Sequence, residues 1–548
     1  MNVLLVESNY KNKYPPIGLM KISTYHKNKG DNVLFFKGKL DSDTFMKLKI
    51  ERVYITTLFT FHYSITLDTI NYYQTIIDSN RIYIGGILAT LMYERLHKDL
   101  KKKCIIIKKQ LTNSNMIGFE DNINIDCLPL DYSILDDVEY KYPSGDNYFA
   151  YISRGCCNKC EFCAVPTLEP KLMLTNNIIE QIHAIENAYG KKQNLLLMDN
   201  NILSFNIKQL SEIVEDIYSL GFDKETKFIS ELPFDTYMRK LKNLSKGSTT
   251  FNLVLKDCIA YLNEKLNTRK SKIYNDKYIE LLELINQGND KFSIIYKYEP
   301  IIREILAAYY KPKGRKRSVD FNQGMDARIL SKNEEKMKIL SKIPISPFRL
   351  AFDKLEYKKD YETALRLAHK YGVTEFSNYL LYNFDEKPEE LWERLKININ
   401  LAKELKVKIF SFPMKYAPVN EIDRSYVGGH WNKQFLSNIH AILNVTKGIV
   451  AGGQDFFYRA YGRDIKEYFK ILSMPREFVT YRNYFESIGL TEQWEVEFNQ
   501  LTNIEKSELI HVLSTNKPSE NKKIIKILKF YCIKYKSNII RNEEKGGL

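Results

Sequence analysis

The sequence predicts an α/β protein with parallel β-sheets, followed by a helical C-terminal part. Short apolar runs of the kind found in buried parallel strands recur from the first residues to about residue 414. Stretches with helical spacing separate these runs, and that alternation is typical of βαβ units. The chain has 548 residues, of which 44% are hydrophobic, so it is long enough for several separate cores.

Residues 1–130 are predicted to form a Rossmann-like domain. The first helix is expected over Gly18–Tyr25, and Gly30 ends it before the second strand. Ligands of such sheets bind beyond the carboxyl ends of the strands. We expect the strands at Val3–Val6, Asn32–Phe36, Val53–Thr56 and Arg81–Ile84, and the ligand-facing loops at Glu7–Pro16, Thr57–Tyr63 and Gly85–Ala89.

A second α/β domain is predicted over residues 140–414. Residues from about 235 to 316 are interpreted as a helical insertion, because this segment is too long for one crossover helix and has helical stretches at Tyr278–Asn286 and Ile301–Tyr310. The insertion ends in Lys311–Arg317, the densest basic run of the chain. We expect six strands, at Tyr148–Ser153, Asn194–Met198, Val319–Arg328, Phe348–Asp353, Glu375–Asp385 and Lys408–Met414, with Pro388–Glu390 opening the helix after the fifth.

Residues 415–548 are predicted to form a mostly helical domain. From Asn521 to Arg541, lysines alternate with apolar residues at helical spacing, which indicates a basic amphipathic helix. Such a helix either covers a core or binds an anionic partner, and we expect it to cover the core.

Four of the eight cysteines lie in the short loop that follows the first strand of the second domain. Three thiolates from one short loop can hold three irons of a cubane cluster and leave the fourth iron open to an external ligand. Cys156, Cys160 and Cys163 have the spacing C-x3-C-x2-C. A second register begins at Cys157, but a ferredoxin-type run would need a further Cys-Pro shortly after Cys163, and Ala164-Val165-Pro166 follows instead. Cys157 is therefore interpreted as a spectator thiol.

A zinc knuckle and a chance group of buried thiols are the alternatives to an iron–sulfur cluster at this loop. A structural zinc knuckle normally needs two separated C-x2-C pairs, and no second pair exists among Cys104, Cys127, Cys258 and Cys532. A chance group would require no particular spacing. The spacing that is present favours an iron–sulfur cluster.

The C-x3-C-x2-C loop, with aromatic Phe162 before its last cysteine, resembles the signature of the radical S-adenosylmethionine (radical SAM) enzymes. The resemblance implies a partial (βα)6 TIM-type barrel and a 4Fe-4S cluster on Cys156, Cys160 and Cys163. It also implies that SAM chelates the open iron. An electron from an external flavodoxin- or ferredoxin-type reductant then splits SAM into methionine and a 5′-deoxyadenosyl radical, which abstracts hydrogen from a substrate that the sequence does not identify.

The same resemblance implies a set of SAM-binding residues at the strand ends. Asp199 and Asn200 would bind the amino end of SAM, although an ordinary polar helix cap explains them equally well. An arginine such as Arg328 can pair bidentately with the SAM carboxylate. The complete set of expected SAM-binding residues is Phe162, Asp199, Asn200, Asn322, Gln323, Arg328 and Asp353.

The N-terminal domain resembles the cobalamin-binding domain found in one class of radical SAM enzymes. The resemblance rests on Pro15–Leu19, Gly30–Val33 and Ile84–Ile87. Domains that bind cobalt through histidine have Asp-x-His-x-x-Gly after the first strand, and the loop Glu7–Asn12 has no histidine. Cobalamin ligated by histidine is therefore not expected. Other relatives bind cobalamin without such a ligand or have lost it, so a cobalamin-dependent methyltransferase remains an alternative.

The net charge of +15 and the isoelectric point of 9.0 suit a polyanionic partner such as nucleic acid. A third, weaker hypothesis is therefore a non-catalytic, metal-containing nucleic-acid-binding protein. Much of the lysine also fits a codon bias toward A and T, because Asn, Ile and Tyr are abundant as well.

Cysteine usage and hydropathy predict a cytoplasmic protein that does not enter a membrane. Clustering of four cysteines in one loop, with the others scattered, indicates a reducing compartment. Met1–Glu7 has no basic leader, and no stretch approaches the roughly 18 consecutive apolar residues of a membrane span.

Overall fold

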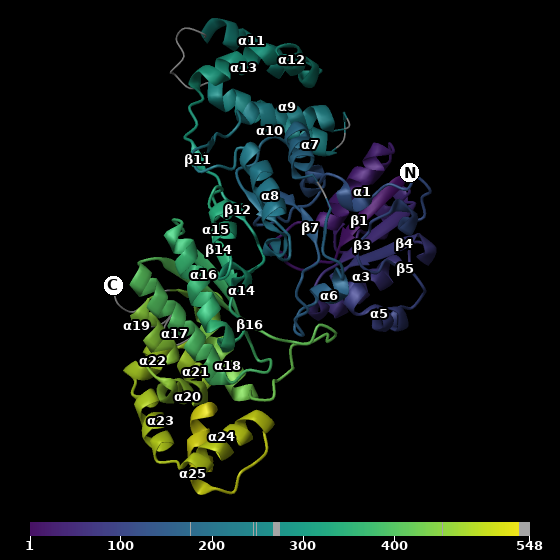
Figure 1. Ribbon diagram of the computed structural model, residues 1–548. Helices are drawn as coiled ribbons and strands as arrows, with labels where there is room; N and C mark the ends of the chain where they lie inside the picture. Colours follow the sequence, from purple (N-terminus) through teal and green to yellow (C-terminus); the bar gives the residue numbers. More distant parts are fainter. Residues whose placement is uncertain (176, 245, 248, 267–274, 452, 536–548) are drawn as a thin grey trace, which may run out of the picture. The chain divides into compact units, whose positions relative to one another are not determined.

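The computed structural model describes residues 1–548 except 176, 245, 248, 267–274, 452 and 536–548. The chain divides into two compact units, Met1–Gln323 with Ile339–Ser346, and Gly324–Lys338 with Pro347–Leu548. Each unit contains a parallel sheet and helices, so the predicted α/β class is confirmed (Figure 1). The three predicted domain boundaries stay a prediction. In the described part of the chain, no helix combines the length and the apolarity that crossing a bilayer requires.

The first unit begins with a five-stranded parallel sheet in the order β2-β1-β3-β4-β5. Its strand β1 is almost fully buried, as expected for an apolar run inside a parallel sheet. Strands β2 and β3 flank β1 on opposite sides, so a crevice is expected at the carboxyl ends of β1 and β3. The four predicted strands and the first predicted helix are confirmed. The elements are β1 (Asn2–Glu7), α1 (Ile17–Asn28), β2 (Asn32–Lys37), α2 (Ser42–Lys47), β3 (Arg52–Thr57), α3 (Tyr63–Tyr73), β4 (Ile82–Gly86), α4 (Ile87–Leu91), α5 (Tyr93–Asp99) and β5 (Ile105–Ile106).

A three-stranded parallel sheet in the order β12-β9-β6 follows in the same unit. A short antiparallel hairpin, β7 with β8, leaves β6 and encloses the cysteine loop. Asn206 and Gln209 form a capping box that starts α8 after the end of β9. The elements are β6 (Tyr148–Ala150), β7 (Ser153–Arg154), α6 (Val165–Leu168), β8 (Met173–Leu174), α7 (Ile178–Tyr189), β9 (Leu195–Leu197), α8 (Ile207–Ser219) and β12 (Val319–Asp320).

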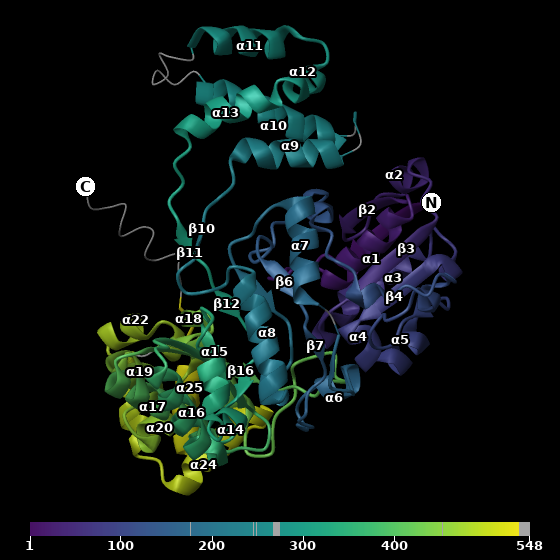
Figure 2. The ribbon, with the colours of Figure 1, turned by 45° about the horizontal axis from the view of Figure 1, so that its top comes forward.

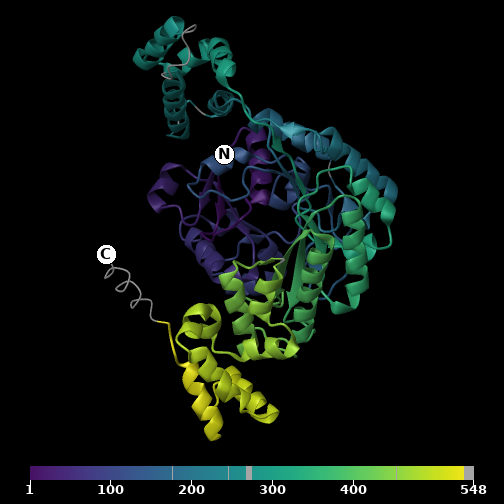
Figure 3. The ribbon, with the colours of Figure 1, turned by 90° about the vertical axis from the view of Figure 1, so that its left-hand side faces the viewer.

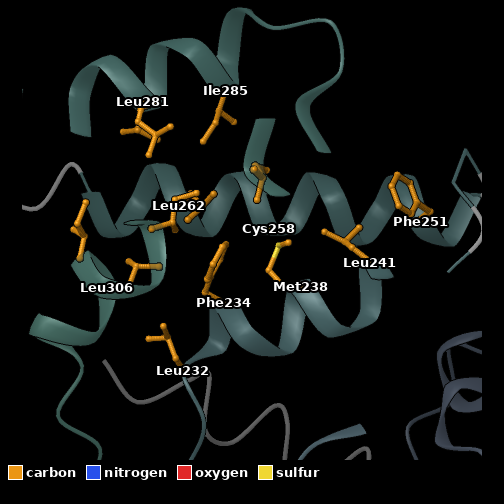
Figure 4. Close-up of a cluster of buried hydrophobic side chains, with 14 residues drawn as sticks. Leu232, Phe234, Met238, Leu241, Phe251, Cys258, Leu262, Leu281, Ile285 and Leu306 are labelled. Atoms are coloured by element: carbon orange, nitrogen blue, oxygen red, sulfur yellow. The ribbon is translucent and has the colours of Figure 1, made fainter. Parts of the chain in front are cut away.

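The predicted insertion is a helical module with its own hydrophobic core (Figure 4). Phe234, Cys258, Leu262 and Ile302 are fully buried in this core, and every buried member lies between Leu232 and Leu306. Strands β10 and β11 pair antiparallel where the chain enters and leaves the module, below its helices in Figure 2. The elements are β10 (Lys227–Phe228), α9 (Pro233–Asn243), α10 (Thr249–Leu266), α11 (Asn275–Gln287), α12 (Lys291–Lys297), α13 (Glu299–Tyr309) and β11 (Arg315–Lys316).

The second unit contains a five-stranded sheet in the order β13-β14-β15-β16-β17, parallel except for the β16–β17 pair. Buried hydrogen bonds from Tyr361 to Asn398 and from Asn398 to Ser411 join α16, α17 and β16 on one face of this sheet. Pro388 opens α17, as predicted. The elements up to the last strand are β13 (Met325–Asp326), α14 (Ala327–Leu330), α15 (Glu334–Leu340), β14 (Phe348–Ala351), α16 (Lys358–Lys370), β15 (Glu375–Tyr382), α17 (Pro388–Leu405), β16 (Lys408–Lys415), α18 (Lys433–Val445) and β17 (Val450–Ala451).

Residues after β17 are helical, as predicted, and appear in yellow-green and yellow in Figure 3. In the last helix, Ile524 and Ile527 are fully buried, which agrees with a basic amphipathic helix that covers a core. The part of this predicted helix beyond residue 535 lies outside the described residues. The helices are α19 (Gln454–Tyr461), α20 (Ile465–Ser473), α21 (Arg476–Thr480), α22 (Arg482–Ser487), α23 (Leu490–Asn499), α24 (Asn503–Thr515) and α25 (Lys522–Tyr531).

One predicted strand, Val319–Arg328, differs from the structure. It is split into β12 and β13, which belong to different sheets, and the chain turns into α14 at Ala327. The turn has a local cause, because the Asp326 carboxylate accepts a hydrogen bond from the Arg328 backbone N–H at 3.0 Å and caps the helix. The other five predicted strands are present. Closure of all six into one barrel stays a prediction.

We expect Phe234→Ala to destabilise the helical module by about 3–5 kcal/mol, because it removes a fully buried aromatic ring from a small core. Hydrogen exchange measured by mass spectrometry should show lost protection in α9–α13 and unchanged protection in β1–β4. Leu253→Ala, at a side chain that is 57% exposed on α10, is the matched control and should change stability by less than about 0.5 kcal/mol. Unchanged exchange in α9–α13 of Phe234→Ala would show that this core does not hold the module together.

Candidate active site

The cysteine loop starts at Gly155, at a point where the backbone leaves no room for a side chain. Gly155 has φ +79°, and a Cβ atom placed there would lie 2.3 Å from the Lys171 carbonyl oxygen on the returning side of the hairpin. Glycine is therefore required both for its left-handed conformation and for the close approach of the two backbones. The loop between Gly155 and α6 is thus held at both ends by the β7–β8 hairpin.

The three predicted cluster ligands are half-buried in this loop. The Cys156 thiol accepts hydrogen bonds from the Asn158 backbone N–H at 3.4 Å and from Asn201 Nδ2 at 3.8 Å, and the Cys163 thiol accepts one from Val165 N–H at 3.5 Å. The Cys163 N–H donates to the Cys160 carbonyl at 3.0 Å. Donors aimed at sulfur are the groups that tune cluster thiolates.

Grouping of the three thiols around one metal site stays a prediction. Among the residues that the structure describes, no three His, Cys, Asp or Glu side chains are grouped so that they could hold a metal ion. The fourth thiol, Cys157, is exposed and accepts a hydrogen bond from the Ser204 hydroxyl at 3.1 Å. The Cys157 sulfur therefore contacts Ser204, whereas the Cys156 sulfur contacts Asn201.

Arg154, immediately before the loop, forms a buried network that the sequence did not predict. Its guanidinium donates to both carboxylate oxygens of Asp126, at 2.6 and 3.0 Å, and to Glu169 at 2.9 Å, and it stacks over Tyr151 at 3.5 Å. Burial opposes the positive charge, but Tyr151 and the two carboxylates raise the pKa of Arg154 above its usual value. The Lys21 ammonium also pairs with Asp126, at 2.8 Å.

Glu169 connects this network to the cysteine loop. Besides Arg154, its carboxylate accepts hydrogen bonds from the Gly155 N–H at 2.8 Å and from Asn200 Nδ2 at 2.6 Å. One carboxylate therefore fixes the first residue of the loop and a predicted SAM-binding side chain. No local sequence signal marks Glu169, because it follows α6 in an irregular segment.

Asp199 is buried and its carboxylate is engaged by the backbone that leads into the loop. It accepts hydrogen bonds from the Ser153 N–H at 2.5 Å and from the Ile152 N–H at 3.2 Å. Burial raises the pKa of Asp199 to about 6, and the hydrogen bonds from Ser153 and Ile152 act in the opposite direction. Asp199 therefore joins the ends of β6 and β9, and its predicted contact with SAM stays a prediction.

The end of β12 brings two more predicted residues into the first unit. The Asn322 side chain is buried and accepts a hydrogen bond from the Tyr14 hydroxyl at 2.6 Å, while its Nδ2 lies 3.8 Å from Met198 Sδ. Gln323, the next residue, is exposed. Tyr14 thus connects the N-terminal domain to the ends of β9 and β12.

Arg328 and Asp353 belong to the second unit. The Arg328 guanidinium pairs with Asp326 through Nε at 2.9 Å and Nη2 at 2.7 Å, and it stacks over Tyr357 at 4.7 Å. Burial raises the pKa of Asp353 to about 6, although Arg394 and Arg328 act to lower it. Phe162, in the first unit, is half-buried beside the last cysteine. SAM binding by these three residues stays a prediction.

A cavity of about 350 Å³ lies at the carboxyl ends of β1, β3 and β4, where the strand order predicts a ligand site. Its far wall comes from the segment that leads to the cysteine loop, including Tyr151 and Arg154. Gly86 shapes the floor, because it has φ +112° and a Cβ there would lie 2.2 Å from the Thr57 carbonyl oxygen. The Tyr10 ring faces the cavity, and its buried hydroxyl has no hydrogen-bond partner among the described residues.

Comparison with known proteins found a partial similarity. The chain is 26% identical over 148 residues to a protein described as a probable dual-specificity RNA methyltransferase RlmN from Caldanaerobacter subterraneus subsp. tengcongensis. The matched segment is 26% of this chain and spans 43% of that protein. This similarity supports an enzyme and the radical SAM superfamily at the level of a distant, partial relationship. No protein-family model matches the chain.

Replacing Glu169 by Gln should loosen the start of the cysteine loop. The variant removes the charge that pairs with Arg154. Its amide NH2 would also face the N–H donors of Gly155 and Asn200, so we expect the free energy of unfolding to fall by about 1–3 kcal/mol. Urea unfolding measures that loss, and iron content after anaerobic reconstitution should fall with it. Glu180→Gln, at an exposed carboxylate on the neighbouring helix α7, is the control and should behave as wild type. Equal stability and iron content in the two variants would contradict the role given to Glu169.

Proposed function

We propose that the protein is a radical SAM enzyme. A 4Fe-4S cluster on Cys156, Cys160 and Cys163 would reductively cleave SAM, with one electron from an external reductant, and the resulting 5′-deoxyadenosyl radical would abstract hydrogen from a substrate. The observation that carries the proposal is the C-x3-C-x2-C loop at the carboxyl end of a strand of a parallel sheet, the edge where such sheets bind ligands. The partial similarity to a protein described as an RNA methyltransferase supports it.

The donor set of the loop fits thiolate ligands to iron. Asn158, Asn201 and Val165 supply N–H donors to the sulfurs of the first and third cysteines. Neutral N–H groups near sulfur stabilise the thiolate form that binds iron. Arg154 and Lys21, on one side of the loop, are already paired with carboxylates and so do not compete for the cysteines.

SAM would be held by residues at the ends of several strands, as the family resemblance implies. In the first unit, Asn200 lies against Glu169 and Asn322 against Tyr14, so both amides are already oriented by hydrogen bonds. In the second unit, the Arg328 guanidinium is already paired with Asp326 through two nitrogens, and its contact with SAM stays a prediction. We propose that Asp199 acts mainly as the residue that fixes the loop, since both carboxylate oxygens already accept backbone hydrogen bonds.

Cobalamin-dependent methyl transfer is the second candidate, and the cavity beside β1, β3 and β4 favours it. The cavity lies at the ligand edge of the N-terminal sheet and reaches Arg154, next to the cysteine loop. Glu7, at the end of β1, is buried in an ion pair with Lys37 at 2.5 Å, so this side chain is not placed as a cobalt ligand. Cobalamin, if bound there, would be held without Glu7 as a ligand.

Cysteine variants test the proposed register. We expect about four irons per chain in wild type after reconstitution, and dithionite-driven formation of 5′-deoxyadenosine from SAM, since three thiolates hold the cluster. Cys156→Ser and Cys160→Ser should lose at least 90%, roughly tenfold, of this activity, whereas Cys157→Ser should keep it. Loss with Cys157→Ser and retention with Cys156→Ser would establish the other register. Zinc in place of iron, with SAM untouched, would overturn the proposal.

A pocket-filling variant tests the second candidate. Gly18 lines the cavity, and a Cβ added there meets no atom within 4 Å, so Gly18→Phe should fold normally while it fills the ligand space. If cobalamin binds there, wild type should retain it through gel filtration and Gly18→Phe should retain roughly tenfold less, with iron content unchanged. Gly429→Phe, at an equally open position in the second unit, is the control. Failure of wild type to take up cobalamin would remove this candidate and leave the first one standing.

A further inference from the structure

The positive charge of the chain is concentrated in the helical module and the strands that lead into it. Residues 233–317 contain 18 Lys and Arg against nine Asp and Glu, a net charge of +9 out of the +15 of the whole chain. Most of the net charge thus belongs to a segment that is less than a sixth of the sequence. A local excess of this kind indicates a surface for an anionic partner only if the charges are free to meet it.

Inside the module, several of the basic side chains are paired with carboxylates. Arg239 pairs with Glu231, Lys240 with Asp136, and Lys246 with Asp290, each within 2.8 Å. Lys242 and Arg303 likewise share Glu299, at 2.9 Å. These ion pairs neutralise part of the positive charge of the module.

The strands that lead into the module have the opposite character. We define the basic neck as Lys227 on β10 together with Lys311, Lys313, Arg315 and Lys316 on and before β11; all five are exposed. Within the described parts of the chain, none of the five has a carboxylate oxygen within 4.0 Å. The acids closest in sequence to β10 are Glu225, which is exposed, and Glu231, whose carboxylate is paired with Arg239 at 2.7 Å.

The pairing register places two of these lysines directly opposite each other. Lys227 faces Lys316 across the two strands, and like charges at directly opposed positions destabilise a β-ladder. The Lys227 side chain also packs over Gly314, where an added Cβ would lie 2.9 Å from it, so the lysine stem lies along the ribbon. The Arg315 guanidinium lies 5.1 Å from the Phe228 ring centroid. An anion between Lys227 and Lys316 would remove the repulsion.

The backbone of the neck is fixed although its charges are not paired. Arg317 stacks over Phe222 at 3.7 Å and donates to the Leu220 and Gly221 carbonyl oxygens at 3.0 and 3.1 Å. The Lys316 carbonyl accepts a hydrogen bond from Gln193 Nε2 at 2.7 Å. The cations are therefore presented from an ordered ribbon, which lowers the entropy lost on binding.

We propose that the basic neck binds the sugar-phosphate backbone of a nucleic acid. Lys311, Lys313 and Arg315 occupy alternate positions, and in an extended chain alternate residues lie about 6.6 Å apart. That spacing matches about two nucleotide steps of roughly 3.4 Å along a strand. Tyr309, 48% exposed and two residues before Lys311, offers a ring on which a base can stack. A row of cations beside an aromatic ring is the arrangement that single-stranded nucleic acid requires.

The neck lies at the end of the sheet that is opposite to the cysteine loop. Strand β11 precedes β12, so the neck adjoins the amino ends of β12 and β9, whereas the candidate SAM residues of the first unit follow the carboxyl ends of the same strands. A nucleic acid on the neck is therefore anchored away from the chemistry. The proposal does not depend on the radical SAM function, and its failure would leave that function untouched.

Charge-removal variants of the full chain test the neck. Lys227→Gln, Lys313→Gln and Lys316→Gln are combined in one variant, and the control combines Lys98→Gln, Lys101→Gln and Lys103→Gln, three exposed lysines without ion pairs in the described structure. Fluorescence anisotropy with a labelled single-stranded RNA of about 20 nucleotides is measured from about 50 to 300 mM KCl. The neck variant should bind about 10- to 100-fold more weakly at about 100 mM, and its slope of log K against log[salt] should be shallower by about 2, while the control keeps most of its affinity.

Three results would overturn the proposal. The first is equal RNA affinity in the neck and control variants, and the second is no binding by wild type at about 50 mM KCl. The third is binding of wild type to phosphatidylglycerol vesicles that excess RNA does not displace, which would assign the neck to a membrane surface. Circular dichroism checks the fold, and Lys313→Gln alone, outside the paired strands, should still flatten the salt slope by about 0.7. If DNA of the same sequence binds more weakly than RNA, the neck also contacts the 2′-hydroxyl groups of the RNA.

Discussion

The ion pairs of Arg154 with Asp126 and Glu169 are the interaction on which the candidate site depends. Asp126 belongs to the segment between the N-terminal sheet and β6, Arg154 precedes the cysteine loop, and Glu169 follows it. A buried guanidinium is stable only when its donors are satisfied, and here two carboxylates and a tyrosine ring satisfy it. Glu169 in turn binds the start of the loop at Gly155 and the Asn200 side chain, and Arg154 lines the far wall of the cavity, so all three depend on this network.

In the first unit, the candidate sites at the carboxyl ends of the strands are separated from the basic neck at the amino ends. In each parallel sheet the carboxyl ends of the strands lie at one edge: the cavity next to Gly86 lies at that edge of the N-terminal sheet, and the cysteine loop and the Tyr14–Asn322 contact follow the carboxyl ends of β6 and β12 in the second sheet. The amino ends of β9 and β12 adjoin the neck. The cysteine loop and the basic neck thus lie toward opposite ends of these strands. This separation follows from topology alone and needs no large movement of the chain.

Sequence patterns predicted the regular elements well and the contacts at the site poorly. Apolar runs such as Val3–Val6 and Leu195–Leu197 identified buried strands, because a strand covered on both faces must be apolar throughout. The end of the chain's extended segment at Asp326 was missed, since the aspartate that caps α14 looks like one more polar residue at a strand end. Glu169 was missed because its partners are 15 and 31 residues away in sequence and no spacing rule relates them. Asp199 was predicted to be important, but its backbone-binding role becomes visible only when Ser153 is placed beside it.

The antiparallel pairing of β10 with β11 has a consequence for how such a protein can evolve. The two chain segments that enter and leave the helical module are hydrogen-bonded neighbours, and the module has a core that uses only its own residues. The gap between them is one that a short hairpin turn can close, so deleting the module and joining Phe228 to Arg315 through about two turn residues would leave the sheet connected. The module could therefore be gained or lost as one unit, while Lys227, Arg315 and Lys316 of the neck and the sheet behind them stay in place.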